Sequence, residues 1–392
     1  MNDIFSDRIS DVPRSFIREI LKVTLDKSII SFAGGLPNRD LFPVEDLREA
    51  TMHVFEHDAK DALQYSTTEG YLPLREYIAE RYATRHNLKV DPSEVLITSG
   101  SQQGLDLLGK VCLNEGDDVI IEEPGYLGAI QTFSVYRSTF HPVPVMDEGV
   151  DVDILSDVLD SCNAKLFYTV PNFQNPSGIT YSEENRIAVS RLLQDRQTLL
   201  IEDDPYGELR FMGSEKKSFR HFLPKNTVLL GSFSKIVVPS FRIGWIVARE
   251  EVMEKLVIAK QATDLHTNYF CQRIIHEYLR THSIDDHIEL IKSVYLKQRQ
   301  AMVDAIKAHF PSDVHHTEPE GGMFLWVSLP VNVSSVNLFN RAIEEKVAFV
   351  PGNPFYVNRH ETNTLRLSFS CVDEKTIEEG IERLAKVIRE FV

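Results

Sequence analysis

The sequence of 392 residues has little cysteine, no long apolar run and no excess of positive charge. Its four cysteines lie far apart, so there is no CxxC pair, no zinc-binding spacing and no disulfide framework. We interpret them as small buried hydrophobic side chains. No apolar run approaches the ~18 residues of a membrane span, and the polar, acidic segment Met1–Asp7 is not a signal peptide. We therefore expect a cytoplasmic protein that does not bind membranes.

Basic residues are also scarce, because 42 Lys and Arg stand against 58 Asp and Glu, which gives a net charge of −16. A broad surface for nucleic acid or for an anionic membrane needs a positive field, so this balance argues against both. Apolar residues make up 43% of the chain and charged residues 26%, which is typical of a globular protein. The length predicts one large domain and one smaller domain.

Short apolar runs alternate with helical segments from about residue 94 onward. The runs lack in–out alternation, which is typical of strands that helices cover on both faces. The sequence therefore predicts an α/β fold with a mostly parallel sheet that has helices on both faces. The predicted strands are Val95–Thr98, Asp118–Ile121, Lys165–Val170, Thr198–Ile201, Thr227–Leu230 and Ile243–Ala248.

The pattern of elements divides the chain into three regions. An N-terminal arm over residues 1–43 includes a predicted helix at Ser15–Val23. Residues 44–280 form the predicted large domain, and residues 281–392 form a smaller α+β domain. Further helices are predicted from Val44 and at Leu74–His86, Glu289–Phe310 and Val336–Lys346, and further strands at Met323–Leu329 and Thr364–Ser370.

Ligands collect at the carboxyl ends of parallel strands, where several of these runs are followed by polar residues. Ser99–Gly104 leads from a strand into a helix, whose free N–H groups can hold a phosphate. The segment contains neither GxGxxG nor a P-loop, so on its own it also fits an ordinary turn. Glu202–Asp204 places three carboxylates at another strand end, which is typical of a solvated acidic loop or a divalent-metal site.

Lys235 and Arg242 follow the strand at Thr227–Leu230. A lysine inside a pocket loses its proton readily and becomes a nucleophile toward carbonyl groups, whereas most lysines lie on the surface. Asn175 lies in a turn signalled by Asn-Pro-Ser-Gly. Tyr126 follows a further strand, where it could cover a flat ring or pack in the core.

The set of groups at these strand ends matches the needs of pyridoxal 5′-phosphate. The phosphate needs a helix N-terminus and an arginine, and the aldehyde needs a lysine. The ring nitrogen needs a carboxylate, which keeps it protonated so that the ring withdraws electrons. Each signal is weak alone, and the combination is specific.

In the order of its motifs, the sequence resembles the fold-type I pyridoxal-phosphate aminotransferases. It is most similar to the subgroup of 2-aminoadipate aminotransferase (LysN-like) and kynurenine aminotransferase II. The similarity runs over nearly the whole chain, from Ser15 to Ser368. The motifs are Phe32–Pro37 (FAGGLP), Asn175–Gly178 (NPSG), Glu202–Tyr206 (EDDPY) and Ser232–Lys235 (SFSK).

The resemblance implies a role for each candidate residue. Lys235 would form the Schiff base with the cofactor and shuttle the proton, and Asp203 would pair with the ring nitrogen. Tyr206 and Asn175 would hydrogen-bond the phenolic oxygen, and Tyr126 would stack on the ring. The phosphate contacts would come from Ser101, Gln102, Ser232 and Arg242, and from Tyr65 of a second subunit across a homodimer interface.

The resemblance also implies how the substrate binds. Arg366 would hold the α-carboxylate beside Asn175 and Gly35, although its strand alone fits an exposed arginine. Arg18, on the N-terminal helix, would meet a distal carboxylate. The sequence departs from the family pattern at Asn38-Arg39-Asp40, which adds a charge beside the FAGGLP loop and leaves open whether Arg39 faces the site. No residue is assigned to a metal.

The reaction implied is a ping-pong transfer of an amino group. The donors would be L-amino acids such as glutamate, 2-aminoadipate, aromatic or branched-chain amino acids, and the acceptors 2-oxo acids such as 2-oxoglutarate. A C–S β-lyase or a decarboxylase on the same fold would carry the same cofactor residues. A non-catalytic aminotransferase-like regulator is disfavoured by the charge and by the presence of Lys235 and Asp203. A Rossmann-type dehydrogenase is disfavoured by the missing glycine fingerprint.

Overall fold

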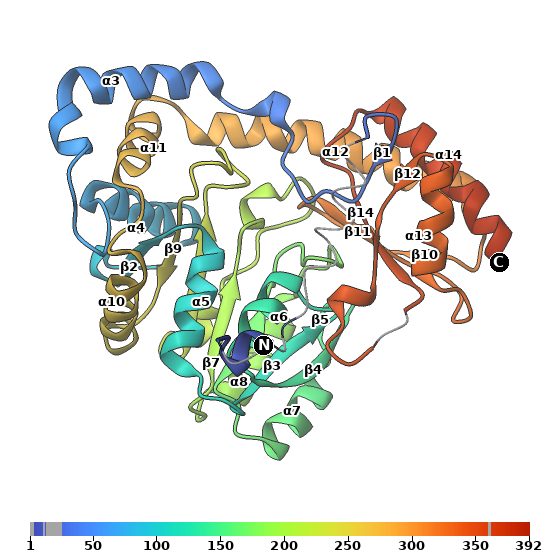
Figure 1. The fold of residues 1–392 in the computed structure, drawn as a ribbon, viewed down its shortest axis with the longest axis horizontal. Coiled ribbons are helices and arrows are strands. Elements are labelled where there is room, and N and C mark those ends of the chain that lie inside the picture. Colours follow the sequence, from blue (N-terminus) through green and yellow to red (C-terminus); the bar gives the residue numbers. More distant parts are fainter. Residues whose placement is uncertain (1–3, 11, 13–25, 360–361) are drawn as a thin grey trace.

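The computed structural model describes residues 4–10, 12, 26–359 and 362–392. Within these ranges an eight-stranded sheet forms the larger part of the molecule and a four-stranded sheet the smaller part. Figure 1 shows the larger part at the left and centre and the smaller part at the right. The helix predicted at Ser15–Val23, and Arg18 with it, lies outside the described residues.

The large sheet has the order β2-β9-β8-β7-β6-β3-β4-β5. β9 is antiparallel to both of its neighbours and β5 is antiparallel to β4, while the other pairs are parallel. The mostly parallel sheet expected from the continuous apolar runs is therefore confirmed. The strands are β2 Val95–Thr98, β3 Asp118–Glu123, β4 Thr139–Met146, β5 Gly149–Val150, β6 Leu166–Thr169, β7 Leu199–Asp203, β8 Thr227–Ser232 and β9 Gly244–Val247.

Helices cover both faces of this sheet. One face packs against α5, α6 and α10 in the main apolar core, and the other packs against α7, α8 and α9 in a second apolar core. Among the described helices, none has the length and apolar character needed to cross a membrane. The helices of this part are α3 Val44–Ala62, α4 Leu72–His86, α5 Ser101–Cys112, α6 Leu127–Ser134, α7 Val152–Ser161, α8 Glu183–Leu193, α9 Phe219–Phe222, α10 Glu250–Asp264 and α11 Tyr269–Thr281.

The smaller sheet has the order β10-β11-β14-β13 and packs with three helices. The arm contacts this sheet, because the backbone N–H of Ser368, at the end of β14, donates to the Phe32 carbonyl at 2.8 Å. β1 pairs with β12 in a separate two-stranded sheet, and the Phe32 N–H donates to the Ala348 carbonyl at 2.8 Å. The domain boundaries at residues 43 and 280 stay predictions. The elements are β1 Ile30–Ser31, α12 Ile284–His309, β10 His315–His316, β11 Phe324–Ser328, α13 Ser335–Glu344, β12 Val347–Ala348, β13 Val350–Pro351, β14 Thr364–Ser368 and α14 Glu374–Phe391.

Each strand predicted from an apolar run is present, but β4 carries no such prediction. It contains Pro142 and Pro144, and a proline has no N–H to donate to a neighbouring strand, so prolines are rare inside a sheet. β3 flanks both prolines on one side, whereas β5 pairs only with Val145 and Met146 on the other. The prolines thus occupy a stretch of β4 with a single neighbouring strand, which the sequence alone does not reveal.

Candidate active site

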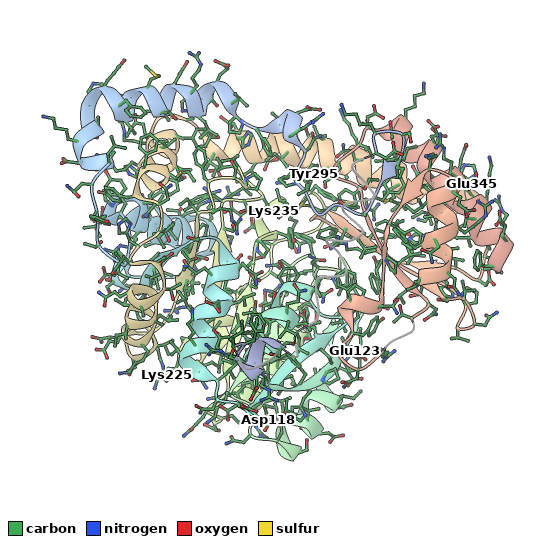
Figure 2. The ribbon with its side chains drawn as sticks, viewed as in Figure 1. Asp118, Glu123, Lys225, Lys235, Tyr295 and Glu345 are labelled. Atoms are coloured by element: carbon green, nitrogen blue, oxygen red, sulfur yellow. The ribbon has the colours of Figure 1, made fainter. Side chains whose placement is uncertain are left out.

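A cavity of about 440 Å³ lies at the carboxyl ends of the central strands, between the two sheets. Figure 2 shows Lys235 in the middle of the molecule, where the two parts meet. The cavity brings together residues that are up to 331 positions apart in the sequence, from Gly35 to Arg366. The predicted residues that line it are Gly35, Ser101, Gln102, Tyr126, Asn175, Asp203, Tyr206, Ser232, Lys235, Arg242 and Arg366.

Lys235 follows β8 and extends its amine into this cavity. Its Nζ donates to the carbonyl oxygen of Gly35 at 2.9 Å. Burial lowers the pKa of Lys235 to about 8, and the positive charges of Arg366 and Arg242 act in the same direction. A substantial neutral fraction therefore exists near neutral pH, and a neutral amine can attack a carbonyl group or accept a proton.

Asp203 ends β7 and is 3% exposed. Its Oδ2 accepts a hydrogen bond from the Tyr168 hydroxyl at 2.8 Å, whereas its Oδ1 has no partner among the described residues. Burial raises the pKa of Asp203 to about 7, and the nearby charges of Asp204 and Glu122 add to this. A buried carboxylate with a free oxygen at a cavity wall is suited to accept a proton-bearing ring nitrogen.

The N-terminus of α5 and Arg242 form a cradle at one end of the cavity. Gly100 precedes the helix with a φ of +76°, a left-handed conformation that favours glycine, and a Cβ there would press against Nη2 of Arg242. Arg242 donates to the Ser99 carbonyl at 3.3 Å, and Ser232 Oγ donates to Ser234 Oγ at 2.9 Å. Free helix N–H groups, hydroxyls and a guanidinium form a donor set for a phosphate.

Four further side chains line the cavity between the cradle and the small sheet. The rings of Tyr126 and Tyr168 lie 6.4 Å apart with an interplanar angle of 27°. Burial raises the pKa of Tyr206, so its hydroxyl keeps its proton at neutral pH and can donate a hydrogen bond. That hydroxyl interacts with the amide of Asn175.

Arg366 lies on β14, in the small sheet, and is 4% exposed. Its Nη1 donates to Asn175 Oδ1 and its Nη2 to the Ala33 carbonyl, both at 2.8 Å, and its Nε has no partner among the described residues. Burial lowers its pKa to about 10, so it remains a cation at neutral pH. The exposed position that its strand pattern alone would fit is excluded.

These observations fit pyridoxal 5′-phosphate. The free Oδ1 of Asp203 suits the protonated ring nitrogen, the cradle beside Gly100 suits the phosphate, and Lys235 supplies the amine. The donor set is therefore complete within one chain for the ring and the aldehyde.

Tyr65, which is a predicted site residue, does not line the cavity, and neither does Arg39, whose orientation the sequence left open. Tyr65 is 79% exposed and its ring meets His266 edge-on, with centroids 5.9 Å apart. Arg39 is almost fully exposed beside Asp40, away from the cavity lining. Arg18 lies within the residues that the structure does not describe.

The sequence argument did not assign several cavity residues, among them Ser234, Tyr168, Phe324 and Phe355. Ser234 shares the SFSK motif with Ser232 and Lys235, and the tight turn there brings both serines to the cradle. Tyr168 is part of a predicted strand, but its bond to Asp203 depends on the pairing of β6 with β7. Phe324 and Phe355 come from the small sheet and its loop, and no local pattern marks them.

Comparison with known proteins places these residues in a family context. The model of the family "Aminotransferase class I and II" matches residues 27–384. The aromatic-amino-acid aminotransferase 1 of Thermococcus litoralis is 42% identical, over 98% of this chain and 94% of that protein. The 2-aminoadipate transaminase of Thermus thermophilus is also 42% identical, over 99% of this chain and 97% of that protein.

A solved structure gives the same result in three dimensions. The kynurenine aminotransferase of Pyrococcus horikoshii, in complex with PMP, superposes with a TM-score of 0.95 at 43% identity. The match covers 99% of this chain and 97% of that chain. The cavity described above thus belongs to a fold shared over almost the entire length of both proteins.

Proposed function

Because this chain belongs to the class I and II aminotransferase family, we propose roles for its own residues in the transfer of an amino group. The protein is a pyridoxal-phosphate-dependent aminotransferase that acts on an amino acid and a 2-oxo acid. The observation that carries the assignment of roles is that Lys235, the free oxygen of Asp203 and Arg366 line one cavity.

The cofactor is held by three groups of residues in this proposal. Asp203 accepts a hydrogen bond from the ring nitrogen, and its charge keeps that nitrogen protonated. Tyr126 stacks on the ring, while Tyr206 and Asn175 hydrogen-bond the phenolic oxygen. The phosphate lies in the cradle made by Ser101, Gln102, Ser232, Ser234 and Arg242.

When bound, pyridoxal 5′-phosphate withdraws electrons from the substrate α-carbon and carries the amino group between the two half-reactions. In this chain, Lys235 is the residue that transfers the proton. Its Nζ, held by the Gly35 carbonyl, accepts the α-proton when neutral and returns it afterwards. The pKa of about 8 supports this role, because a base works best when its pKa lies near the working pH.

Arg366 binds the α-carboxylate of the amino acid. Asn175 and Ala33 hold two of its nitrogens, so the plane of the guanidinium is fixed before the substrate arrives. The rings of Phe324 and Phe355 also contact it, with its Cζ 4.3 Å and 5.3 Å from their ring centroids. This packing leaves the donors at the cavity edge free for a carboxylate.

The wall of the cavity supports a broad range of amino acids. Leu36, Leu127 and Phe355 present apolar surface, which suits aromatic and branched side chains. Glutamate and 2-aminoadipate are proposed as further donors, with 2-oxoglutarate as an acceptor and Arg18 as the partner of a distal carboxylate. Two of the relatives have names that refer to aromatic amino acids and to 2-aminoadipate.

We also propose that two copies of the chain form a homodimer in which Tyr65 reaches the phosphate of the partner's site. Apolar side chains on α3 and at its end, before Tyr65, are exposed on the single chain, among them Met52, Phe55 and Leu63. Their burial against a second copy would remove this surface from water. Tyr65→Phe is expected to weaken cofactor retention on dilution while the dimer, measured by light scattering, persists.

The visible absorption of the purified holoenzyme tests the function directly. Adding a single amino acid without an oxo acid should bleach the band of the bound cofactor, and adding 2-oxoglutarate should restore it. The rates for glutamate, 2-aminoadipate, tyrosine and leucine rank the donors. A band that persists while ammonia, carbon dioxide or a thiol is released would contradict amino transfer.

A further inference from the structure

Three side chains with metal-binding atoms meet at the end of the large sheet opposite the cavity. Asp118 begins β3, His141 lies in β4, and Cys162 follows α7. One ligand atom of each lies within 4.8 Å of the others, and Asp118 Oδ1 is 2.7 Å from His141 Nε2. Figure 2 shows Asp118 at the lower edge of the molecule, far from Lys235.

The sheet register explains why these residues meet. His141 stands opposite Ile120 in the parallel pair of β3 and β4, and Asp118 lies two residues before Ile120. Since side chains alternate along a strand, Asp118 and His141 lie on the same face. Helix α7 covers that face and ends at Ser161, and Cys162 has extended backbone with a φ of −138°, which redirects the chain toward β6.

A carboxylate oxygen, an imidazole nitrogen and a sulfur are the donor types that proteins offer to Zn²⁺. We propose that Asp118, His141 and Cys162 bind a zinc ion, with a water molecule or an external ligand in the fourth position. The two anionic ligands would neutralise the charge of the ion. No metal site is assigned by the sequence spacing, because the three ligands come from three separate elements.

The geometry needs only a small adjustment. Zinc bonds of about 2.0–2.3 Å imply separations of about 3.5 Å between tetrahedral ligands. The pair Asp118 and His141 would move apart as the ion takes the place of the shared proton, and Cys162 would move closer. The side chains of Asp118 and His141 are 27% and 26% exposed, so an ion can reach them from solvent.

The Cys162 thiol lies beside the two other proposed ligands, since its sulfur is within 4.8 Å of a ligand atom of Asp118 and of His141. It would bind the ion as a thiolate. The nearby cation Arg196 donates to the Leu159 carbonyl and to Asp160, which directs it toward the end of α7. Zinc binding would replace the thiol proton, which leaves to solvent as the zinc–sulfur bond forms.

The test uses the holoenzyme and zinc alone. Competition with a chromophoric chelator should show a single site per chain, and Zn²⁺ should slow alkylation of Cys162, mapped by mass spectrometry. Cys112 is the internal control, since it is half-buried on α5 and belongs to no such cluster among the described residues. Co²⁺ should give a thiolate-to-metal absorption band.

Ligand variants separate this site from adventitious binding. Cys162→Ser and His141→Asn should each weaken zinc binding by more than ~100-fold, because even outer partners of a ligand contribute 10–100-fold. Cys112→Ser should leave it unchanged. The proposal would be overturned if both ligand variants bound zinc as tightly as the unaltered protein, or if zinc did not slow the alkylation of Cys162. The alkylation result needs no variant, so it stands even if one of them folds poorly.

Discussion

The cavity and the buried hydrogen-bond network around Glu122 contain the same kinds of groups, yet only the cavity is suited to chemistry. Asp203 and Glu122 are both buried carboxyl groups whose pKa burial raises to about 7. Oδ1 of Asp203 has no hydrogen-bond partner among the residues described, whereas Glu122 accepts from the Val170 N–H, the Tyr181 hydroxyl and the Gln174 amide. A perturbed pKa is therefore common to both and does not identify the site.

The same contrast separates two lysines, the half-buried Lys235 and the buried Lys260. Within the part of the chain that the structure describes, Lys235 makes a single hydrogen bond, to Gly35, and it faces the cavity. Lys260 is 0% exposed, and Asp264, Gln103 and Thr267 surround its amine within 2.9 Å. The lesson is that reactivity needs an unfilled hydrogen-bonding position together with space for a ligand.

The largest effect is expected when Lys235 and Lys260 are substituted separately and compared. Lys235→Ala should lower the rate of amino transfer by at least ~10⁴-fold, because both the nucleophile and the proton carrier are lost. Stopped-flow absorption of a single half-reaction measures it. Lys260→Met is the matched control, and it should lower Tm while changing the rate by less than about tenfold. Comparable losses of rate in both variants would refute the distinction.

The carboxyl pair gives the next effect. Asp203→Asn keeps the size of the side chain but removes the charge that holds the ring nitrogen protonated, so kcat/KM should fall by about 10³-fold. Glu122→Gln should act mainly on stability, since an amide cannot accept from all three donors. We expect the free energy of unfolding to fall by about 1–3 kcal/mol. Steady-state kinetics with thermal unfolding of both variants gives the comparison. A larger kinetic loss in Glu122→Gln would reverse our assignment.

Two arginines allow a third comparison. Arg366→Ala should lower kcat/KM for amino acids by about 10²-fold, largely through KM, because the α-carboxylate loses its cation. Arg186 is also buried, but all three of its nitrogens donate within the protein, for example to Pro171 and Tyr181. Arg186→Met should therefore reduce Tm without a selective rise in KM. An unchanged KM in Arg366→Ala would exclude the proposed role.

The smallest effect is a pH dependence. The carboxyl of Glu122 in the unfolded chain loses its proton near pH 4.5, but in the folded protein it keeps the proton to about pH 7. The folded state binds more protons in that window, so the contribution of Glu122 to stability falls as pH rises, by at most about 1.4 kcal/mol per unit.

Glu122→Gln removes this slope. As the pH rises from 4.5 to 7, the Tm of the unaltered enzyme should therefore fall relative to the Tm of the variant. Other buried carboxyls, such as Glu202, are present in both proteins and cancel in the difference. Parallel Tm curves over this range would show that Glu122 does not titrate as described.

Local sequence was sufficient for much of the fold. The continuous apolar runs predicted the strands of the parallel sheet, since burial on both faces requires apolar residues at every position. The polar residues after each run predicted the cavity edge, because parallel strands bring their carboxyl ends together. The strand β4 escaped prediction, since the effect of Pro142 and Pro144 depends on which neighbours the strand has.

The sequence by itself determined the family, the cofactor and the residue types at each strand end, because these are written in contiguous motifs such as SFSK. Only the tertiary structure decided which of those groups keep a free hydrogen-bonding position. Arg366 is fixed by Ala33, 333 residues away, and Asp203 by Tyr168 on the neighbouring strand. Hydrogen-bond satisfaction in a buried site is a property of long-range partners, and therefore no local pattern can supply it.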